Sequence, residues 1–291
     1  MLASKPVVLS AHGRHAQCVA FTRSGRLLLS AGQDAHIRLW SVPGFKAVGS
    51  ITGHRNSVNS LVFSPAETQL ATSSSDGTVR VWSFPEGRPV RVLEKQAGAR
   101  FSPGGRFLAS FSSRGRIAIW SMPDGEEVAR SEVIDRRIFS IEFAPDESML
   151  VVGGTGQIHF LTMPDAVLEA SVPAHDAAVA ALQRSPDGLT MISAGPPGIV
   201  RLWATANWAP LAAIPLDAAG TYASAFSPDS ATVAVGIDFH IAMVSVAGRA
   251  VTDRVRVGVK GIYGMAWSPD GRYLANAAAD GKVRVWSVEG S

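Results

Sequence analysis

Histidine, serine or threonine, and aspartate recur at fixed offsets before several tryptophans, and these are the residue types of a hydrolase triad. The His precedes the Trp by 28 residues, the Ser or Thr by 10 and the Asp by 6. A nucleophile is needed only once, however, and a buried indole N–H needs a hydrogen-bond acceptor. We therefore interpret the set as a structural hydrogen-bond network and expect no catalytic residue in it. Its members are His12, Ser30, Asp34 and Trp40; His54, Thr72, Asp76 and Trp82; His175, Ser193 and Trp203; and Asp280 with Trp286.

Not every copy of the set is complete. Pro197 replaces the Asp of the fifth copy, and the seventh copy has Asn276 at the Ser position and no His. Copies three, four and six lack the network, and two of them replace the Trp by Leu161 and Val244. We expect these blades to rely on apolar packing and to be the softer part of the fold.

The elements that must position these residues are repeats of about 41 residues. Seven segments of the type IRLW or VRVW end near residues 40, 82, 120, 161, 203, 244 and 286. A turn such as SPDG at 268–271 runs in phase with them, and Pro, Asp and Gly in this order favour a type I turn. Alternating segments flank each turn, which indicates about four short antiparallel strands per repeat.

Four strands per repeat of this length predict an all-β fold, a seven-bladed β-propeller of four-stranded antiparallel blades. Each blade buries both faces only by stacking on its neighbours, so we expect residues 1–291 to form a single domain. The last repeat lacks an outer strand, while the N-terminus has an orphan strand, KPVVLS at 5–10. We predict that residues 5–10 pair with 282–287, which closes the ring and removes an open sheet edge.

Composition bounds the class of protein. The chain has 46% hydrophobic and 18% charged residues, which is typical of a globular protein. The single cysteine, Cys18, excludes an intrachain disulfide and favours a reducing compartment. We find no signal-peptide pattern and no apolar run long enough for a membrane span, so we expect a cytoplasmic protein with no membrane association. A net charge of +3 argues against nucleic acid as the main partner.

In its repeat motifs the chain resembles the WD-repeat family over essentially its whole length. The marks are Gly53-His54, the Asp76-Gly77 turn and Trp82 in the best copy, although Ser or Ala follows every such Trp where the family has Asp. The compact SPDG turns look like those of bacterial members of the family. The resemblance implies that Trp donates to the Ser or Thr hydroxyl, that this hydroxyl bonds the His, and that the His bonds the Asp.

The resemblance also implies that proteins or peptides dock on the face formed by the loops that enter the blades, which we name the inter-blade loops. Arg and Tyr are favoured at interfaces, and a basic rim would select an acidic segment. We therefore expect a non-enzymatic, monomeric scaffold for protein–protein interaction, without cofactor or metal. The residues expected to bind the partner are Arg14, His15, Arg55, Asn56, Arg136, Arg137, Tyr222, Lys260 and Tyr263.

Other hypotheses stay open. Each of these side chains also fits an ordinary solvated loop. Some propellers are hydrolases or lactonases with a site in the channel, but we find no convergent cluster of acids, His or metal ligands here. Weak nucleic-acid binding through the same basic rim would show a steep salt dependence. Four arginines that lie two residues before a blade-terminal Trp could form a basic ring for phosphate backbones, but we interpret them as a solvated face; they are Arg38, Arg80, Arg201 and Arg284.

Two irregularities stand out. Four residues are missing from the connection that leads from Trp82 to Pro103, compared with the other repeats. Arg184 occupies a strand position that is aromatic in the other repeats. It either extends outward to solvent or pairs with an acid of a neighbouring blade.

Overall fold

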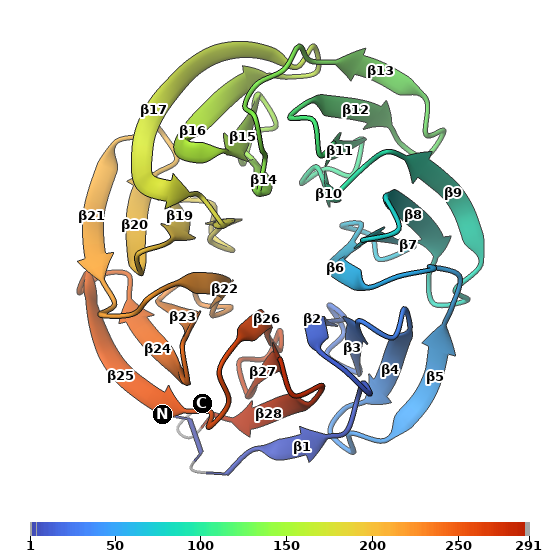
Figure 1. The fold of residues 1–291 in the computed structure, drawn as a ribbon, viewed down its shortest axis with the longest axis vertical. Helices are drawn as coiled ribbons and strands as arrows, with labels where there is room; N and C mark the ends of the chain where they lie inside the picture. The colour runs from blue at the N-terminus through green and yellow to red at the C-terminus, as the bar shows by residue number, and fades with distance from the viewer. Residues whose placement is uncertain (1, 4, 289–291) are drawn as a thin grey trace. The chain divides into compact units, whose positions relative to one another are not determined.

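The computed structural model describes residues 2, 3 and 5–288, without the side chains of Thr221 and Tyr222. In this part of the chain 28 strands form seven four-stranded antiparallel sheets, and no helix is present. The sheets are the blades of a β-propeller (Figure 1), which confirms the predicted fold class.

The chain divides into two compact units. One consists of residues 1–61, 74–76 and 216–291, and the other of residues 62–73 and 77–215. The expectation that residues 1–291 are a single domain stays a prediction, and we describe each unit by itself.

The first unit contains blades one, six and seven. Blade one consists of β2 (Ala16–Phe21), β3 (Leu27–Gly32), β4 (Ile37–Ser41) and β5 (Ala47–Ile51). Blade six consists of β22 (Thr221–Phe226), β23 (Thr232–Ile237), β24 (His240–Ser245) and β25 (Ala250–Arg256). Blade seven consists of β26 (Ile262–Trp267), β27 (Tyr273–Ala278), β28 (Val283–Ser287) and β1 (Val7–Leu9).

The second unit contains blades three, four and five. Blade three consists of β10 (Gly98–Phe101), β11 (Phe107–Phe111), β12 (Ile117–Ser121) and β13 (Glu127–Arg130). Blade four consists of β14 (Ser140–Phe143), β15 (Met149–Gly153), β16 (Thr155–Thr162) and β17 (Val167–Ala178). Blade five consists of β18 (Ala181–Arg184), β19 (Thr190–Gly195), β20 (Ile199–Ala204) and β21 (Pro210–Pro215).

The remaining sheet is blade two. Blade two consists of β6 (Val58–Phe63), β7 (Gln69–Ser74), β8 (Thr78–Ser83) and β9 (Pro89–Glu94).

The N-terminal strand completes the last blade, as predicted. Strand β1 runs antiparallel to β28, with Val7 opposite Val285 and Leu9 opposite Val283 (Figure 1). Leu9 is buried, whereas Val7 is exposed. The pairing therefore satisfies the free backbone edge of β28 and joins two ends of the chain without a covalent bond.

The turns between the first and second strands carry the expected chemistry. In blade six the hydroxyl of Ser227 donates to the Asp229 carboxylate and accepts the backbone N–H of Thr232 at 3.0 Å. Ser268 donates to Asp270 at 2.6 Å in blade seven. These side-chain bonds fix the turn, so the flanking strands enter the sheet in register.

Apolar clusters lie between consecutive blades in each unit. In the first unit Leu28 of blade one and Ala275 of blade seven belong to one cluster, and both side chains are inaccessible to solvent. In the second unit Ile119 of blade three and Leu150 of blade four do the same. Because the second and third strands are covered on both faces, they read as continuous apolar runs, and this accounts for the high hydrophobic content.

Candidate partner-binding surface

The repeated polar set forms a continuous chain of hydrogen bonds in blade one. Trp40 donates its indole N–H to Ser30 Oγ at 3.0 Å, and His12 Nε2 lies 3.0 Å from the same hydroxyl. His12 Nδ1 lies 2.8 Å from Asp34 Oδ1, and Arg38 donates to Asp34 Oδ2. Burial raises the pKa of Asp34, but its bonds to His12 and Arg38 outweigh burial and hold the pKa below its usual value. Ser30 is fully buried, which argues against a nucleophilic role.

The Asp of blade two is more buried than the Asp of blade one. Trp82 donates to Thr72 Oγ1 at 2.9 Å, and His54 Nδ1 lies 2.9 Å from Asp76 Oδ2. The same carboxylate oxygen accepts the backbone N–H of Arg55 at 3.0 Å. The side chain of Asp76 is only 8% exposed. Asp76 therefore anchors an inter-blade loop to the blade.

Blade five contains the network without its acid. Trp203 donates to Ser193 Oγ at 2.9 Å, and His175 Nε2 lies 2.8 Å from that hydroxyl. Pro197 stands where blade one has an Asp, and the buried Nδ1 of His175 has no hydrogen-bond partner in the described part of the chain. Burial first, and then the positive charge of Arg201, lower the pKa of His175 to about 4. This His is therefore neutral at pH 7.

Blade seven replaces the hydroxyl by an amide. Trp286 donates to Asn276 Oδ1 at 2.8 Å. Asp280 accepts both terminal nitrogens of Arg284, at 3.1 and 2.7 Å, instead of a His. The acid at this position thus pairs with an Arg of the third strand, as Asp34 pairs with Arg38 in blade one.

Blade three corrects the expectation that it lacks a network. Trp120 donates to Ser110 Oγ at 2.8 Å, and Ser110 donates to Gln96 Oε1 at 2.9 Å. Gln96 precedes Trp120 by 24 residues, which is the His offset shortened by the four missing residues of this repeat. The expectation was wrong because the deletion moved this position out of the fixed spacing.

Blade four also holds a chain of polar contacts, with different members and an exposed Ser at one end. His159 Nδ1 lies 2.7 Å from Ser171 Oγ, and His159 Nε2 lies 3.2 Å from Asp135 Oδ2. Asp135 also accepts the backbone N–H groups of Thr155 at 2.8 Å and Arg137 at 3.2 Å. This blade was expected to rely on apolar packing alone, and that expectation was wrong because the His moved from the loop to the third strand.

Blade six fits the expectation of an apolar blade. Val244 and Ala234 stand at the Trp and Ser positions, and both are fully buried. Its greater softness stays a prediction.

The four third-strand arginines are not a uniform solvated face. Arg38 and Arg284 form ion pairs with Asp34 and Asp280, four residues before them. The Nε atoms of Arg80 and Arg201 are buried and have no hydrogen-bond partner among the described residues. The interpretation as a solvated face was wrong because two of these side chains pair with an acid of the same blade and the other two bury part of the guanidinium.

Two further side chains settle questions that the sequence left open. Cys18 is buried, and burial raises the pKa of its thiol, so it is a packing residue. Arg184 in β18 is half-buried and pairs with no carboxylate in the described part of the chain; its Nε is buried without a partner. The described residues contain no group of three or more His, Cys, Asp or Glu arranged to hold a metal, and no helix able to span a membrane.

The expected partner-binding residues lie mainly in the inter-blade loops. In the first unit the loops contain Arg14 and His15 before β2, Arg55 and Asn56 before β6, and Lys260 before β26. In the second unit Arg136 and Arg137 precede β14. Tyr222 and Tyr263 were expected in loops, but they belong to strands β22 and β26, because these strands begin earlier than the pattern suggested. The side chain of Tyr222 lies outside the described part of the structure.

Five cations of these loops are exposed and have no carboxylate within 4 Å among the described residues. In contrast, Arg38 and Arg284 in the blades are neutralised by an Asp. Free, solvated cations on a rigid scaffold are available to an anionic partner. The five are Arg14, Arg55, Arg136, Arg137 and Lys260.

Two aromatic rings of the first unit lie together at the loop that contains Arg14. Tyr263 sits at a β-bulge between Ile262 and Gly264, where it faces no residue of β27. Its ring centroid lies 5.6 Å from that of His15, with an interplanar angle of 32°. A bulge re-aims a side chain, and here it places the Tyr beside the loop before β2.

Two contacts fix the loop before β14 in the second unit. Asp135 accepts the N–H of Arg137, and the Arg137 guanidinium lies over the Phe139 ring at 5.1 Å from its centroid. Sequence reasoning did not single out Asp135. A buried His in a third strand, His159, was the signal for it.

Sequence comparisons agree with this geometry. A family model described as "WD domain, G-beta repeat" matches residues 4–41, 45–83 and 255–287. These three segments of the chain thus match WD repeats. The matched segments contain all four strands of blades one and seven and the first three strands of blade two, where His12, His54 and Asp280 occupy the repeat positions.

Fungal proteins named "Eukaryotic translation initiation factor 3 subunit I" are similar to part of this chain. The protein of Neosartorya fischeri is 33% identical over 90 residues, or 31% of this chain and 26% of the relative. The Aspergillus terreus protein is 34% identical over 90 residues, with 31% and 27% covered. The Neurospora crassa protein is 30% identical over the same length, with 31% and 26% covered. The match thus spans about a quarter of each relative, and the likeness of the turns to bacterial WD proteins stays a prediction.

Proposed function

We propose that this protein is a non-enzymatic scaffold that binds an acidic segment of a protein partner through its inter-blade loops. The observation that carries the proposal is the set of five exposed, unneutralised cations in these loops. The WD repeats and the β-propeller fold support an interaction role in general, and the choice of these loops is our own inference.

The positive charge and the rigidity of the inter-blade loops favour them as the binding site. Asp76 holds the backbone of Arg55, and Asp135 holds that of Arg137, so both loops are fixed before a partner arrives. A preorganised surface loses less conformational entropy on binding. The free guanidinium groups can then form charge-assisted, bidentate hydrogen bonds with carboxylates or phosphates.

The buried position of the repeated Ser and Thr hydroxyls speaks against a hydrolase. Ser30 and Ser193 are inaccessible to solvent, and each already accepts an indole N–H. A nucleophile must reach its substrate. We therefore favour binding over catalysis.

The similar fungal proteins are named as one subunit of a translation initiation factor, and a subunit acts in contact with other proteins. We infer a comparable role for this chain within a larger protein assembly. Such a role would place the protein in the cytoplasm. We expect the isolated chain to be a monomer, which sedimentation analysis would test.

Fluorescence anisotropy with two short labelled peptides tests the choice of surface. One peptide contains Glu and Leu, and the other contains Arg at each Glu position. We expect the wild type to bind the acidic peptide, and the triple variant Arg55→Glu, Arg136→Glu, Arg137→Glu to bind it at least about tenfold more weakly. The control variant carries the same charge change at exposed turn positions outside these loops: Arg26→Glu, Lys46→Glu and Arg88→Glu.

Unchanged affinity in the first triple variant, or equal loss in both triple variants, would overturn the proposed surface. Tighter binding of single-stranded RNA than of the acidic peptide, with a steep salt dependence, would favour the nucleic-acid hypothesis instead.

A further inference from the structure

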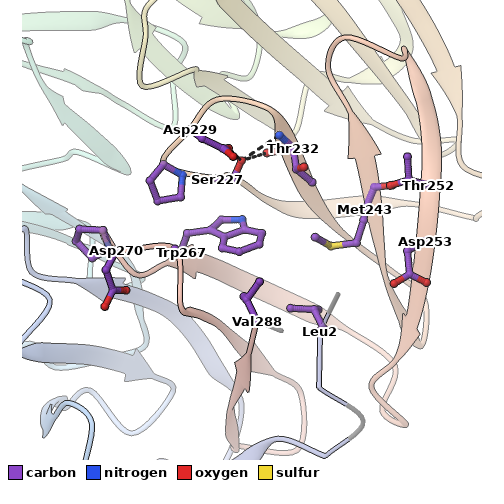
Figure 2. Close-up of a pocket in the computed structure, with 13 residues that line it drawn as sticks. Leu2, Ser227, Asp229, Thr232, Met243, Thr252, Asp253, Trp267, Asp270 and Val288 are labelled. Atoms are coloured by element: carbon purple, nitrogen blue, oxygen red, sulfur yellow. Dashed lines mark hydrogen bonds between the residues drawn. The ribbon is translucent and has the colours of Figure 1, made fainter. Parts of the chain in front are cut away.

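A groove of about 640 Å³ lies between blades six and seven of the first unit (Figure 2). The turns at 227–230 and 268–271 form two of its sides, and β24 and β25 form another. These turns connect first to second strands, so they lie at the opposite ends of β22 and β26 from the inter-blade loops. The volume lies within the range of about 300–1,000 Å³ that is typical of ligand sites.

The floor of the groove is apolar. Trp267 is half-buried, and its indole N–H is fixed by a hydrogen bond to the Ala225 carbonyl at 3.1 Å. Figure 2 shows the Met243 side chain extending toward the Trp267 ring, with Leu2 and Val288 below them in the view. A fixed aromatic ring beside a flexible thioether provides an adaptable seat for an aliphatic side chain.

Three carboxylates surround this floor, and two of them are not neutralised. Asp270 pairs with Arg272 at 2.7 Å. Asp229 accepts Ser227 Oγ and the N–H of Ala231, and these bonds lower the pKa of Asp229 and keep it charged.

Asp253 on β25 is the other free acid. Its Oδ1 accepts only the adjacent backbone N–H of Arg254, at 2.7 Å. Neither Asp229 nor Asp253 has a cation within 4 Å among the described residues. The groove therefore combines an apolar floor with uncompensated negative charge on both sides.

We propose that this groove binds a basic linear segment of a second protein partner, in which an Arg or Lys neighbours a large aliphatic residue. The aliphatic side chain packs on Trp267 and Met243, and the neighbouring cation pairs with Asp253, which lies opposite Met243 in the sheet. Charge complementarity selects this occupant, because an acidic or neutral segment leaves both carboxylates without a partner. This inference does not depend on the inter-blade loops, whose charge is opposite.

The test uses the full chain and the same basic peptide, with alternating Leu and Arg, in fluorescence anisotropy at low salt. The acidic peptide is the matched probe. Asp253→Lys reverses a half-exposed charge with a single backbone bond, and Asp253→Asn removes that charge and keeps the volume. Asp165→Lys is the control, because Asp165 is exposed, outside the groove and equal in charge.

We expect the basic peptide to bind the wild type, Asp253→Lys to weaken binding about tenfold or more, and Asp253→Asn to weaken it less. Asp165→Lys should bind like the wild type, and thermal melting should be unchanged in all three. Equal affinity of the wild type and Asp253→Lys would overturn the proposal, as would a preference for the acidic peptide. A wild-type dimer that Asp253→Lys dissociates would show instead that a second copy of the chain fills the groove.

Discussion

Ser110 donates its hydroxyl to Gln96 Oε1 at 2.9 Å, inside the third blade. Both side chains are buried, and the same hydroxyl accepts the indole N–H of Trp120. Gln96 thus performs, without charge, the role that His12 has in blade one. The same position in two blades thus supplies a partner for the buried hydroxyl, and either His or Gln can fill it.

Removal of the Ser110 hydroxyl breaks two buried hydrogen bonds at once. We expect Ser110→Ala to lower the free energy of unfolding by about 2–3 kcal/mol, because Trp120 and Gln96 both lose their partner. Ser113→Ala changes an exposed Ser of the same blade and should be nearly neutral. Urea unfolding of both variants measures the difference, and equal stability would show that the network contributes nothing.

The Asp of blade two should matter more than an Asp in a surface turn. Asp76 is buried, and it accepts His54 and the N–H of Arg55, whereas the Asp124 side chain is exposed. We expect Asp76→Ala to cost about 2 kcal/mol or more, since both donors are left unpaired, and Asp124→Ala to cost far less. Equal melting temperatures for the two variants would contradict the structural role of Asp76.

The missing acid of blade five predicts a pH dependence. The pKa of His175 is about 4 in the fold, below the value of about 6.5 in an unfolded chain. Between these values the unfolded state binds more protons, so His175 favours the folded state fully above about pH 6.5 and progressively less as the pH falls toward 4.

His175→Gln removes this titration and supplies the side chain that blade three uses at the same position. The wild type should therefore lose stability more steeply than His175→Gln between pH 6.5 and 4. Urea unfolding at several pH values tests this. Parallel curves over that range would mean that His175 is not held neutral by burial.

An ion pair joins blades three and four of the second unit. Arg100 of β10 donates Nε to Glu142 Oε1 at 3.1 Å, and the Glu142 side chain is only 4% exposed. Removal of Glu142 leaves the guanidinium of Arg100, a side chain that is two-thirds buried, without its counter-charge, so Glu142→Ala should destabilise by about 3 kcal/mol. Glu132→Ala, at a side chain that is 95% exposed, is the control and should change stability little. Similar stability of the two variants would contradict a structural role for the pair.

The fold could be predicted almost completely from the sequence, because blade architecture depends on periodic features. Apolar alternation, the turns at 227–230 and 268–271, and the spacing of the terminal Trp residues specify four strands per repeat. The pairing of β1 with β28 followed from counting strands at the two ends. These signals are local or strictly periodic, so a single sequence contains them.

The polar interior was predicted less well. Gln96 was missed because a deletion shifted its offset, and Asp135 was missed because its partner His159 lies on a different strand from the His of other blades. The groove beside Trp267 could not be predicted either. The groove depends on the distance between two turns and an outer strand of neighbouring blades, and no spacing in the sequence predicts that distance.

Affinity capture with intact and charge-reversed protein tests the scaffold account most directly. The three baits are the wild type, the inter-blade variant and the control variant. The inter-blade variant carries Arg55→Glu, Arg136→Glu and Arg137→Glu, and the control carries Arg26→Glu, Lys46→Glu and Arg88→Glu. Each bait is incubated with an extract of the cells that produce the protein, and the bound proteins are identified by mass spectrometry. The account predicts that the wild type and the control retain the same protein partners, while the inter-blade variant loses them without a change in melting temperature. Retention of the same partners by the inter-blade variant would contradict it.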